Sequence, residues 1–195
     1  QWDAATLKEF YHELLDSANS NVELLNNLLN WAQVQTGRMQ FKPTAADLSG
    51  TLRDEICLIR RMAEQKGVNF NVEIPVRTFV TADPRMLATI VRNLLTNAVK
   101  FTPEGGTVTL SAEMTEEKKA EITITDTGTG MTQEQITSLF CLDSRPSQPG
   151  TAGEQGTGLG LTVCREMLER HGSVLQIESQ PNRGSRFRFV IDSAG

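Results

Sequence analysis

The stretch from Asp83 to Lys100 reads DPRMLATIVRNLLTNAVK, and it predicts one long helix with two different faces. Asp83 is a residue type that caps helix N-termini, and Pro84 suits the first helical position. Apolar residues recur every three or four positions, so one face of the helix points inward to a core. That face consists of Leu87, Ile90, Val91, Leu94, Leu95 and Ala98.

The outer face of the same helix carries an unusual polar row. Asn93, Asn97 and Lys100 are separated by four and three positions, which places them within an arc of about 60°. Asparagine is a poor interior helix former, because its amide competes for backbone hydrogen bonds. An amide oxygen can bind a hard cation such as Mg²⁺, and a lysine can bind phosphate oxygens. The row indicates a polar binding site, while a solvated helix face would explain the same residues.

Outward from this helix, apolar residues alternate between the period of a strand and that of a helix. The later strands form hairpins, so we expect an antiparallel or mixed sheet with helices on one face. The expected helices span Asp47 or Ser49 to about Lys66, residues 132–140 and residues 159–171, and the expected strands span residues 68–74, 108–112, 122–124, 174–178 and 187–191. Residues 141–155 show no period and predict a loop.

Two glycine-rich stretches lie where the backbone can approach a ligand. DTGTGM, from Asp126 to Met131, follows a predicted strand, so a planar ring can approach the backbone while the acid accepts a hydrogen bond. GTGLGL, from Gly156 to Leu161, opens a predicted helix whose N–H groups favour an anion. A turn would explain the first stretch and a flexible hinge the second. GTGLGL is neither a Walker loop nor a Rossmann fingerprint, because the required Lys and glycine spacing are missing.

Composition argues against several functional classes. The 195 residues include 19 Lys and Arg against 24 Asp and Glu, and this net charge of −5 disfavours an electrostatic nucleic-acid binder. Hydrophobic residues make up 38% of the chain, which is enough for a folded core. No apolar run approaches the roughly 18 residues that span a bilayer, and no leader peptide opens the chain. The separated Cys57, Cys141 and Cys164 favour a reducing, cytoplasmic compartment and disfavour a zinc site.

The N-terminal segment reads as a separate unit. A helix from about Asp3 to Gln35 would be roughly 50 Å long at 1.5 Å per residue. Such a helix must pair with another helix, because it cannot bury its apolar stripe alone. The stripe consists of Leu7, Tyr11, Leu14, Ala18, Val22, Leu25, Leu28 and Ala32.

The order of the motifs resembles the catalytic ATP-binding domain of sensor histidine kinases, within the wider group of gyrase, heat-shock-chaperone and mismatch-repair ATPases. NLLTNAVKFTP, at residues 93–103, is similar to the N box of that family, and DTGTGM is similar to its first glycine box. Phe140 fits the F box, GTGLGL matches the second glycine box, and GSRF at residues 184–187 resembles the closing glycine motif. The resemblance covers the chain from about Leu48 to its C-terminus.

The resemblance implies a two-layer α/β sandwich, with a mixed, mostly antiparallel sheet, that binds ATP and Mg²⁺. It implies that Asn97 binds Mg²⁺ with help from Asn93, and that Lys100 contacts phosphate. Asp126 would accept a hydrogen bond from the adenine amino group, and residues 141–155, with Arg145, would form a lid over the nucleotide. The implied nucleotide-binding set is Asn93, Asn97, Lys100, Phe101, Asp126, Gly128, Gly130, Met131, Gly156, Thr157, Gly158, Leu159, Gly160 and Leu161.

The N-terminal helix is similar to the second helix of the kinase dimerisation domain. We therefore expect a stalk remnant over residues 1–38, a linker and first strand over residues 39–47, and a catalytic domain over residues 48–195. The phosphoacceptor histidine of the family lies on the preceding helix, before a proline. His12 lacks that proline and lies on the wrong helix, so we expect a fragment without its own acceptor, unable to phosphorylate itself.

The favoured hypothesis is the ATP-binding domain of a two-component sensor histidine kinase. The intact kinase would pass the ATP γ-phosphoryl group to a histidine on its dimerisation helix, as a homodimer, and then to an aspartate of a response regulator receiver domain. Neither nucleic acid nor a membrane is an expected partner of this cytoplasmic fragment. The alternatives are a non-catalytic nucleotide-sensing or docking module of the same fold, an ATPase clamp and a structural helical partner. The clamp is disfavoured because Asn93 stands where hydrolysing relatives have glutamate, and an amide is no general base.

Overall fold

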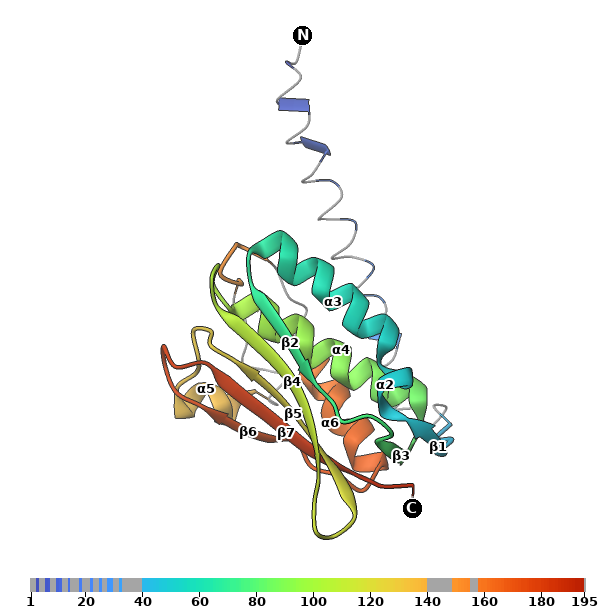
Figure 1. The fold of residues 1–195 in the computed structure, drawn as a ribbon. Helices are drawn as coiled ribbons and strands as arrows, with labels where there is room; N and C mark the ends of the chain where they lie inside the picture. Colours follow the sequence, from blue (N-terminus) through green and yellow to red (C-terminus); the bar gives the residue numbers. More distant parts are fainter. Residues whose placement is uncertain are drawn as a thin grey trace.

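The computed structural model describes residues 40–139, 149–154 and 158–194, together with single residues between Asp3 and Ala32. Within them, helices and pairs of strands follow one another along the chain (Figure 1). The elements are β1 (Thr44–Asp47), α2 (Leu48–Thr51), α3 (Arg53–Lys66), β2 (Asn69–Glu73), β3 (Phe79–Ala82), α4 (Pro84–Phe101), β4 (Thr107–Met114), β5 (Lys119–Asp126), α5 (Gln133–Ser138), α6 (Gly160–Arg170), β6 (Gln176–Ser179) and β7 (Ser185–Asp192).

The central helix is α4, and its predicted cap and apolar face are both confirmed. The Asp83 carboxylate accepts hydrogen bonds from the N–H groups of Arg85, at 3.0 Å, and Met86, at 3.2 Å. These bonds satisfy two N–H groups that have no partner inside the helix. The predicted inward side chains are all at most 1% exposed. The sequence pattern alone therefore fixes where α4 begins and which face it buries.

Five strands form the main sheet in the order β2-β4-β5-β7-β6. Strands β2 and β4 are parallel, and the other neighbouring pairs are antiparallel. Helices α3, α4 and α6 all cover the same face of this sheet (Figure 1). The predicted two-layer arrangement, with a mixed, mostly antiparallel sheet and helices on one face, is confirmed.

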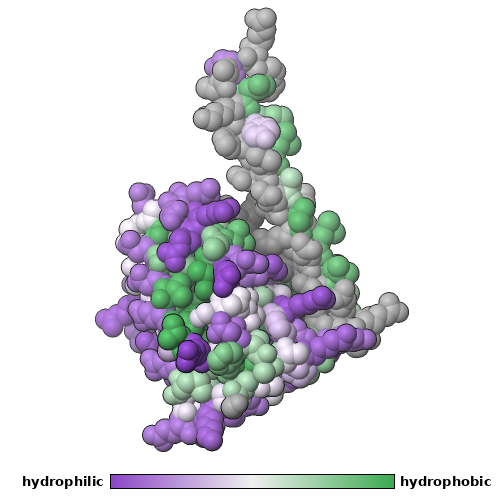
Figure 2. Space-filling model, turned by 45° about the vertical axis from the view of Figure 1, so that its right-hand side comes forward, coloured by the Kyte–Doolittle hydropathy of each residue, from purple (hydrophilic) through white to green (hydrophobic). Residues whose placement is uncertain are grey.

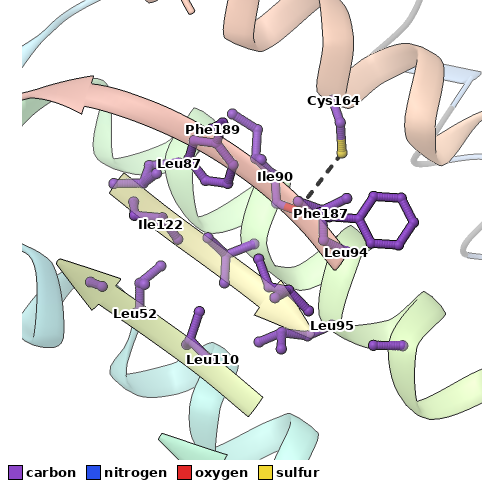
Figure 3. Packing of buried hydrophobic residues seen from close by; sticks show 14 of the residues in the cluster. Leu52, Leu87, Ile90, Leu94, Leu95, Leu110, Ile122, Cys164, Phe187 and Phe189 are labelled. Carbon is purple, nitrogen blue, oxygen red and sulfur yellow. Dashed lines mark hydrogen bonds between the residues drawn. The ribbon is translucent and has the colours of Figure 1, made fainter. Parts of the chain in front are cut away.

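The core lies between the sheet and these helices. Along β5 the side chains of Ala120, Ile122 and Ile124 are fully buried, and half-buried polar residues alternate with them on the other face. Figure 3 shows Leu87, Ile90 and Leu94 of α4 among side chains from β4, β5 and β7. Cys164 of α6 belongs to this cluster, and burial raises the pKa of its thiol to about 12. A buried thiol of this kind packs as a small apolar side chain.

The predicted helix from Asp47 to Lys66 is interrupted. Its cap is Asp47, whose carboxylate accepts a hydrogen bond from the Gly50 N–H at 2.7 Å. Leu52, with φ −96° and ψ 2°, separates α2 from α3. Leu48 and Leu52 are both fully buried, so the interruption lies where the chain packs into the core. Gly67, at φ 70°, ends α3 directly after Lys66, the residue at which the sequence predicts the end of the helix.

The N-terminal stripe is helical at the positions that the structure describes, and all of these except the half-buried Ala32 are exposed. Leu7, Tyr11, Leu14 and Leu25 are between 55% and 68% exposed. Figure 2 shows apolar side chains of this segment in green. His12 lies outside the described residues. None of the helices in the described part of the chain is long and apolar enough to cross a membrane.

Candidate functional site

The polar row on α4 is not a solvated helix face. Lys100 is only 8% exposed, and Asn93 and Asn97 are half-buried. The Asn93 amide donates a hydrogen bond to the Thr89 carbonyl at 3.0 Å, which leaves its own oxygen directed elsewhere. The burial therefore favours a binding site over the alternative of an ordinary surface.

Asn93 lies beside the start of α6. A Cβ atom added to Gly160 would lie 3.0 Å from Asn93 Oδ1, so α6 begins directly against the polar row. Gly158, at φ 70°, and Leu159, the N-cap residue, precede it. Gly156 and Thr157 lie outside the described residues, as do Phe140, Cys141 and Arg145. The structure thus brings the described end of the second glycine box to the N box.

Asn97 lies one helical turn beyond Asn93. Its side chain has no hydrogen-bond partner among the described residues. A half-buried carboxamide without a partner retains an oxygen that can accept a cation and an amide that can donate. No group of three or more His, Cys, Asp or Glu side chains in the described part of the chain could hold a metal ion.

Asp126, the last residue of β5, is the buried acid of the site. It is 4% exposed, and its Oδ1 accepts hydrogen bonds from the N–H groups of Gly128, at 2.8 Å, and Ser185, at 3.2 Å. Burial raises the pKa of this carboxyl, and the hydrogen bonds from Gly128 and Ser185 oppose the shift. A carboxylate held in this way is positioned to accept one more hydrogen bond from a ligand.

The glycines around Asp126 allow three backbones to meet. A Cβ atom on Gly128 would overlap the Phe101 carbonyl oxygen, and one on Gly184, at φ 79°, would overlap that of Asp126. The Asn182 N–H donates to the Thr129 carbonyl at 2.7 Å, which joins the first glycine box to the β6-β7 turn. The closing glycine motif therefore packs directly against Asp126. The sequence analysis placed Ser185 in the closing glycine motif but did not predict its hydrogen bond to Asp126, because no short motif marks a backbone donor 59 residues away.

A cavity of about 420 Å³ opens at the C-terminal end of α4. Its walls come from α4, the first glycine box, the start of α5 and the segment at residues 149–151. The lining residues are Phe101, Thr129, Gly130, Thr132, Gln135, Pro149, Gly150, Thr151 and Pro181. The Lys100 ammonium group lies 5.0 Å from the centre of the Phe101 ring, so a buried positive charge lies at one side of this opening.

Of the predicted nucleotide-binding residues, Phe101 and Gly130 line the cavity directly. Asp126 and Gly128 are not among the lining residues, although Gly128 is tight against the backbone of Phe101 and the side chain of Asp126. Met131 follows Gly130, and its N–H donates to Ser179 Oγ at 2.8 Å. Leu161 packs half-buried against the core. The first glycine box therefore lies at the C-terminal end of α4, whereas Gly160 lies against Asn93 in the middle of the helix.

The comparisons with known proteins agree with this arrangement. The family model described as "Histidine kinase-, DNA gyrase B-, and HSP90-like ATPase" matches residues 82–195. The sensor histidine kinase TmoS of Ectopseudomonas mendocina is 30% identical over 175 residues, which cover 90% of this chain and 18% of TmoS. The adaptive-response sensory kinase SasA of Thermosynechococcus vestitus is 29% identical over 186 residues, which cover 95% of this chain and 48% of SasA.

Solved structures share the fold. The catalytic domain of the histidine kinase ThkA superimposes with a TM-score of 0.67 at 26% identity, covering 80% of this chain and 97% of that domain. Full-length ShkA, solved in complex with AMPPNP, gives a TM-score of 0.77 at 24% identity and covers all of this chain, which corresponds to 41% of ShkA. The chain spans less than half the length of the curated relatives TmoS and SasA. It belongs to the family of histidine kinase-, DNA gyrase B- and HSP90-like ATPases, and residues 82–195 form the ATP-binding domain of that family.

Proposed function

We propose that this domain binds ATP together with Mg²⁺ and serves as the phosphoryl-donating part of a sensor histidine kinase. The main support is Asp126, a buried carboxylate at a strand end whose remaining acceptor capacity suits the amino group of adenine. The glycines beside it let the Phe101 and Gly184 backbones pack closely around it, and Lys100 supplies a buried positive charge nearby. In this proposal Phe101 lies against the purine and Lys100 contacts phosphate oxygens.

The residues on α4 fit a magnesium ion of the kind that nucleotides bring with them. Mg²⁺ takes oxygen ligands, and it usually keeps several waters and binds only one or two protein groups beside the phosphates. The Asn97 carboxamide is an oxygen donor without a partner among the described residues, and Asn93 is its neighbour one turn away. When bound, the ion would neutralise charge on the phosphates. Asn97 would hold it, and Asn93 would orient the ligands around it.

In the intact protein, the γ-phosphoryl group would pass to a histidine on the dimerisation helix and then to an aspartate of a response regulator. Catalysis of this kind consists mainly of positioning and charge stabilisation. Residues 1–38 are proposed as the remnant of the dimerisation stalk and residues 39–47 as its linker. The partners are a second copy of the kinase and a receiver domain. The names of the relatives, a sensor histidine kinase and an adaptive-response sensory kinase, support this proposal.

Calorimetric titration with ADP, in the presence and absence of Mg²⁺, tests the binding site. We expect Mg²⁺ to strengthen ADP binding to the wild-type chain, and this gain to disappear in Asn97→Ala, which removes the proposed oxygen ligand. Thr96→Ala, next to it on the same helix, serves as the matched control and should keep the gain. An identical Mg²⁺ effect in Asn97→Ala and the control would contradict the assignment of Asn97.

Phosphoryl transfer is tested by adding the missing dimerisation helix as a separate chain, with ATP labelled on its γ-phosphate. Acid-labile label on the histidine of that helix is the expected result. Binding of ATP without any label on the helix would instead support the non-catalytic sensing or docking module. Asp126→Asn provides the negative control, because it should remove both the binding and the transfer.

Hydrolysis of ATP by the isolated chain is expected to be weak. The amide of Asn93 cannot take up a proton near neutral pH, so no general base stands at this position to activate water. Phosphate release measured over hours should remain close to the uncatalysed background. Sustained turnover that persists unchanged in Asn93→Ala would show that another residue activates water and would favour the ATPase clamp.

A further inference from the structure

Lys66, the last residue of α3, reaches across to the end of α4. Its ammonium group donates hydrogen bonds to the carbonyl oxygens of Val99, at 3.0 Å, and Lys100, at 2.6 Å. It also donates to Glu154 Oε1 at 2.6 Å. The Lys66 side chain is only 12% exposed. A cation at this place satisfies carbonyl groups that a helix C-terminus leaves unpaired, and it favours the negative end of the helix dipole.

Glu154 forms hydrogen bonds within its own segment, residues 149–154. Its Oε2 accepts a hydrogen bond from the Ala152 N–H at 2.9 Å, and its own carbonyl accepts one from the Gly150 N–H at 2.8 Å. Burial raises the pKa of this carboxyl, but the hydrogen bond from Lys66, those from the backbone N–H groups of Glu154 and Ala152, and the charge of Lys66 together lower it overall. Glu154 is therefore ionised at neutral pH, and it forms a charge-assisted bond with Lys66.

The same segment is fixed to the backbone of Lys100. Thr151 donates to the Lys100 carbonyl from its N–H, at 3.1 Å, and from its hydroxyl, at 3.2 Å. The Thr151 hydroxyl also lies 3.0 Å from the Thr102 carbonyl. Gly150 is tight against the Lys100 side chain, since a Cβ atom added to it would lie 2.5 Å from Lys100 Cγ. Lys66 and Thr151 thus converge on one carbonyl group, that of Lys100.

We propose that Lys66 is a positioning residue for the nucleotide site: with Glu154 it anchors residues 149–154 to the end of α4 and thereby fixes the direction of the Lys100 side chain. Pro149, Gly150 and Thr151 line the cavity next to Phe101, so the anchor also forms one wall of the opening. Lys66 itself contacts no ligand and acts through Lys100. This inference rests on the proposed function, because it assigns to Lys100 the contact with phosphate.

The test compares ADP with adenosine as ligands of the whole chain. In Lys66→Met we expect ADP binding to weaken about tenfold, equivalent to about 1.4 kcal/mol, because the phosphate contact is misaligned. Adenosine, which has no phosphate, should bind within about twofold of the wild type. Lys119→Met removes a lysine from an exposed ion pair with Asp192 and is the matched control, with no expected change. Equal weakening of both ligands would indicate a general structural effect and would overturn the proposal.

A double-mutant cycle tests whether Lys66 acts through Lys100. In the Lys100→Met background, Lys66→Met should cause no further loss of ADP affinity. A full tenfold loss on top of Lys100→Met would overturn the proposal. If Lys66→Met does not fold, Glu154→Gln replaces it in both tests, because this variant keeps the lysine and its bonds to α4. It should weaken ADP binding about threefold, as one charge-assisted bond is lost.

Hydrogen exchange of the nucleotide-free chain separates this inference from the proposed function. Glu154→Gln should accelerate exchange of the Gly150 and Thr151 amides and leave the Asn182 amide unchanged. Unchanged exchange at Gly150 and Thr151 would overturn the anchor. A wild-type chain that fails to bind ADP, while Glu154→Gln still accelerates the two amides, would refute the proposed function and the role through phosphate but leave the anchor in place.

Discussion

At the scale of single residues, Asp126 combines burial with a charge. Burial raises the pKa of its carboxyl above the value in the unfolded chain. Folding therefore favours the protonated carboxyl over the ionised one. The protonated form stabilises the folded state at low pH, and this contribution is lost as the pH rises through the folded pKa. Retaining a carboxylate here costs stability at neutral pH. Such a cost is typical of a site that serves a ligand rather than the fold.

Asp126→Asn is therefore expected to keep or raise the melting temperature at pH 7 while weakening ADP binding at least about tenfold. The amide oxygen can still accept the N–H bonds of Gly128 and Ser185, but it lacks the charge. The difference in unfolding free energy from the wild type should shrink as the pH falls through the folded pKa of Asp126. Calorimetry measures the ADP affinity, and thermal melts at several pH values measure the difference in stability. A clear destabilisation at pH 7, or an unchanged ADP affinity, would contradict this account.

At the scale of the elements, the β6-β7 turn is fixed by the backbone above it. Gly184 and Gly105 have nearly the same conformation, with φ angles of 79° and 80°. A Cβ atom on Gly184 would overlap the Asp126 carbonyl, whereas one on Gly105 would meet nothing within 4 Å. Alanine variants at these two positions therefore distinguish backbone strain alone, at Gly105, from strain combined with steric overlap, at Gly184.

Gly105→Ala should destabilise the domain by about 1 kcal/mol, because an alanine in the left-handed region is strained. Gly184→Ala adds the overlap with Asp126, so we expect at least about 2 kcal/mol more and a loss of ADP binding. Urea denaturation of both variants measures the difference. Equal destabilisation of the two variants would show that the β6-β7 turn can move away from Asp126. The turn would then not be needed to hold Asp126 in place.

At the scale of the whole molecule, the apolar residues divide into two groups. Most of those between Leu48 and Ile191 bury one another between the sheet and the helices. Those of the N-terminal stripe, such as Leu7 and Leu25, remain exposed. Exposed apolar surface of this extent is typical of an interaction surface. The nucleotide site and the exposed stripe therefore depend on different parts of the chain.

Removal of residues 1–38 is expected to leave a folded, monomeric domain with unchanged ADP affinity. The intact chain should self-associate with increasing concentration, because its stripe can be buried only against another helix. Sedimentation velocity and calorimetry on the two chains compare the association and the affinity. A shortened chain that lost ADP binding would show that the N-terminal segment contributes to the site, and self-association that persisted after the removal would place the contact elsewhere.

Much of the fold follows from local patterns. Asp83 begins α4, Gly67 ends α3, and the alternation at Ala120, Ile122 and Ile124 gives a strand with one buried face. The two-layer fold and the family assignment, both predicted from the sequence, are confirmed. The roles of Asn97, Lys100 and Asp126 toward ATP stay predictions, and Gly156 and Thr157 lie outside the described residues.

The sequence by itself determined the start of α4, the buried faces of α4 and β5 and the order of the glycine and asparagine motifs, because caps, periods and turns depend on residues a few positions apart. Only the tertiary structure decided that Lys100 is buried, that Ser185 supports Asp126 from 59 positions away and that Lys66 meets Glu154 across 88 positions. Contacts over such separations leave no periodic pattern, since they arise when packing of the core brings the ends of distant elements together.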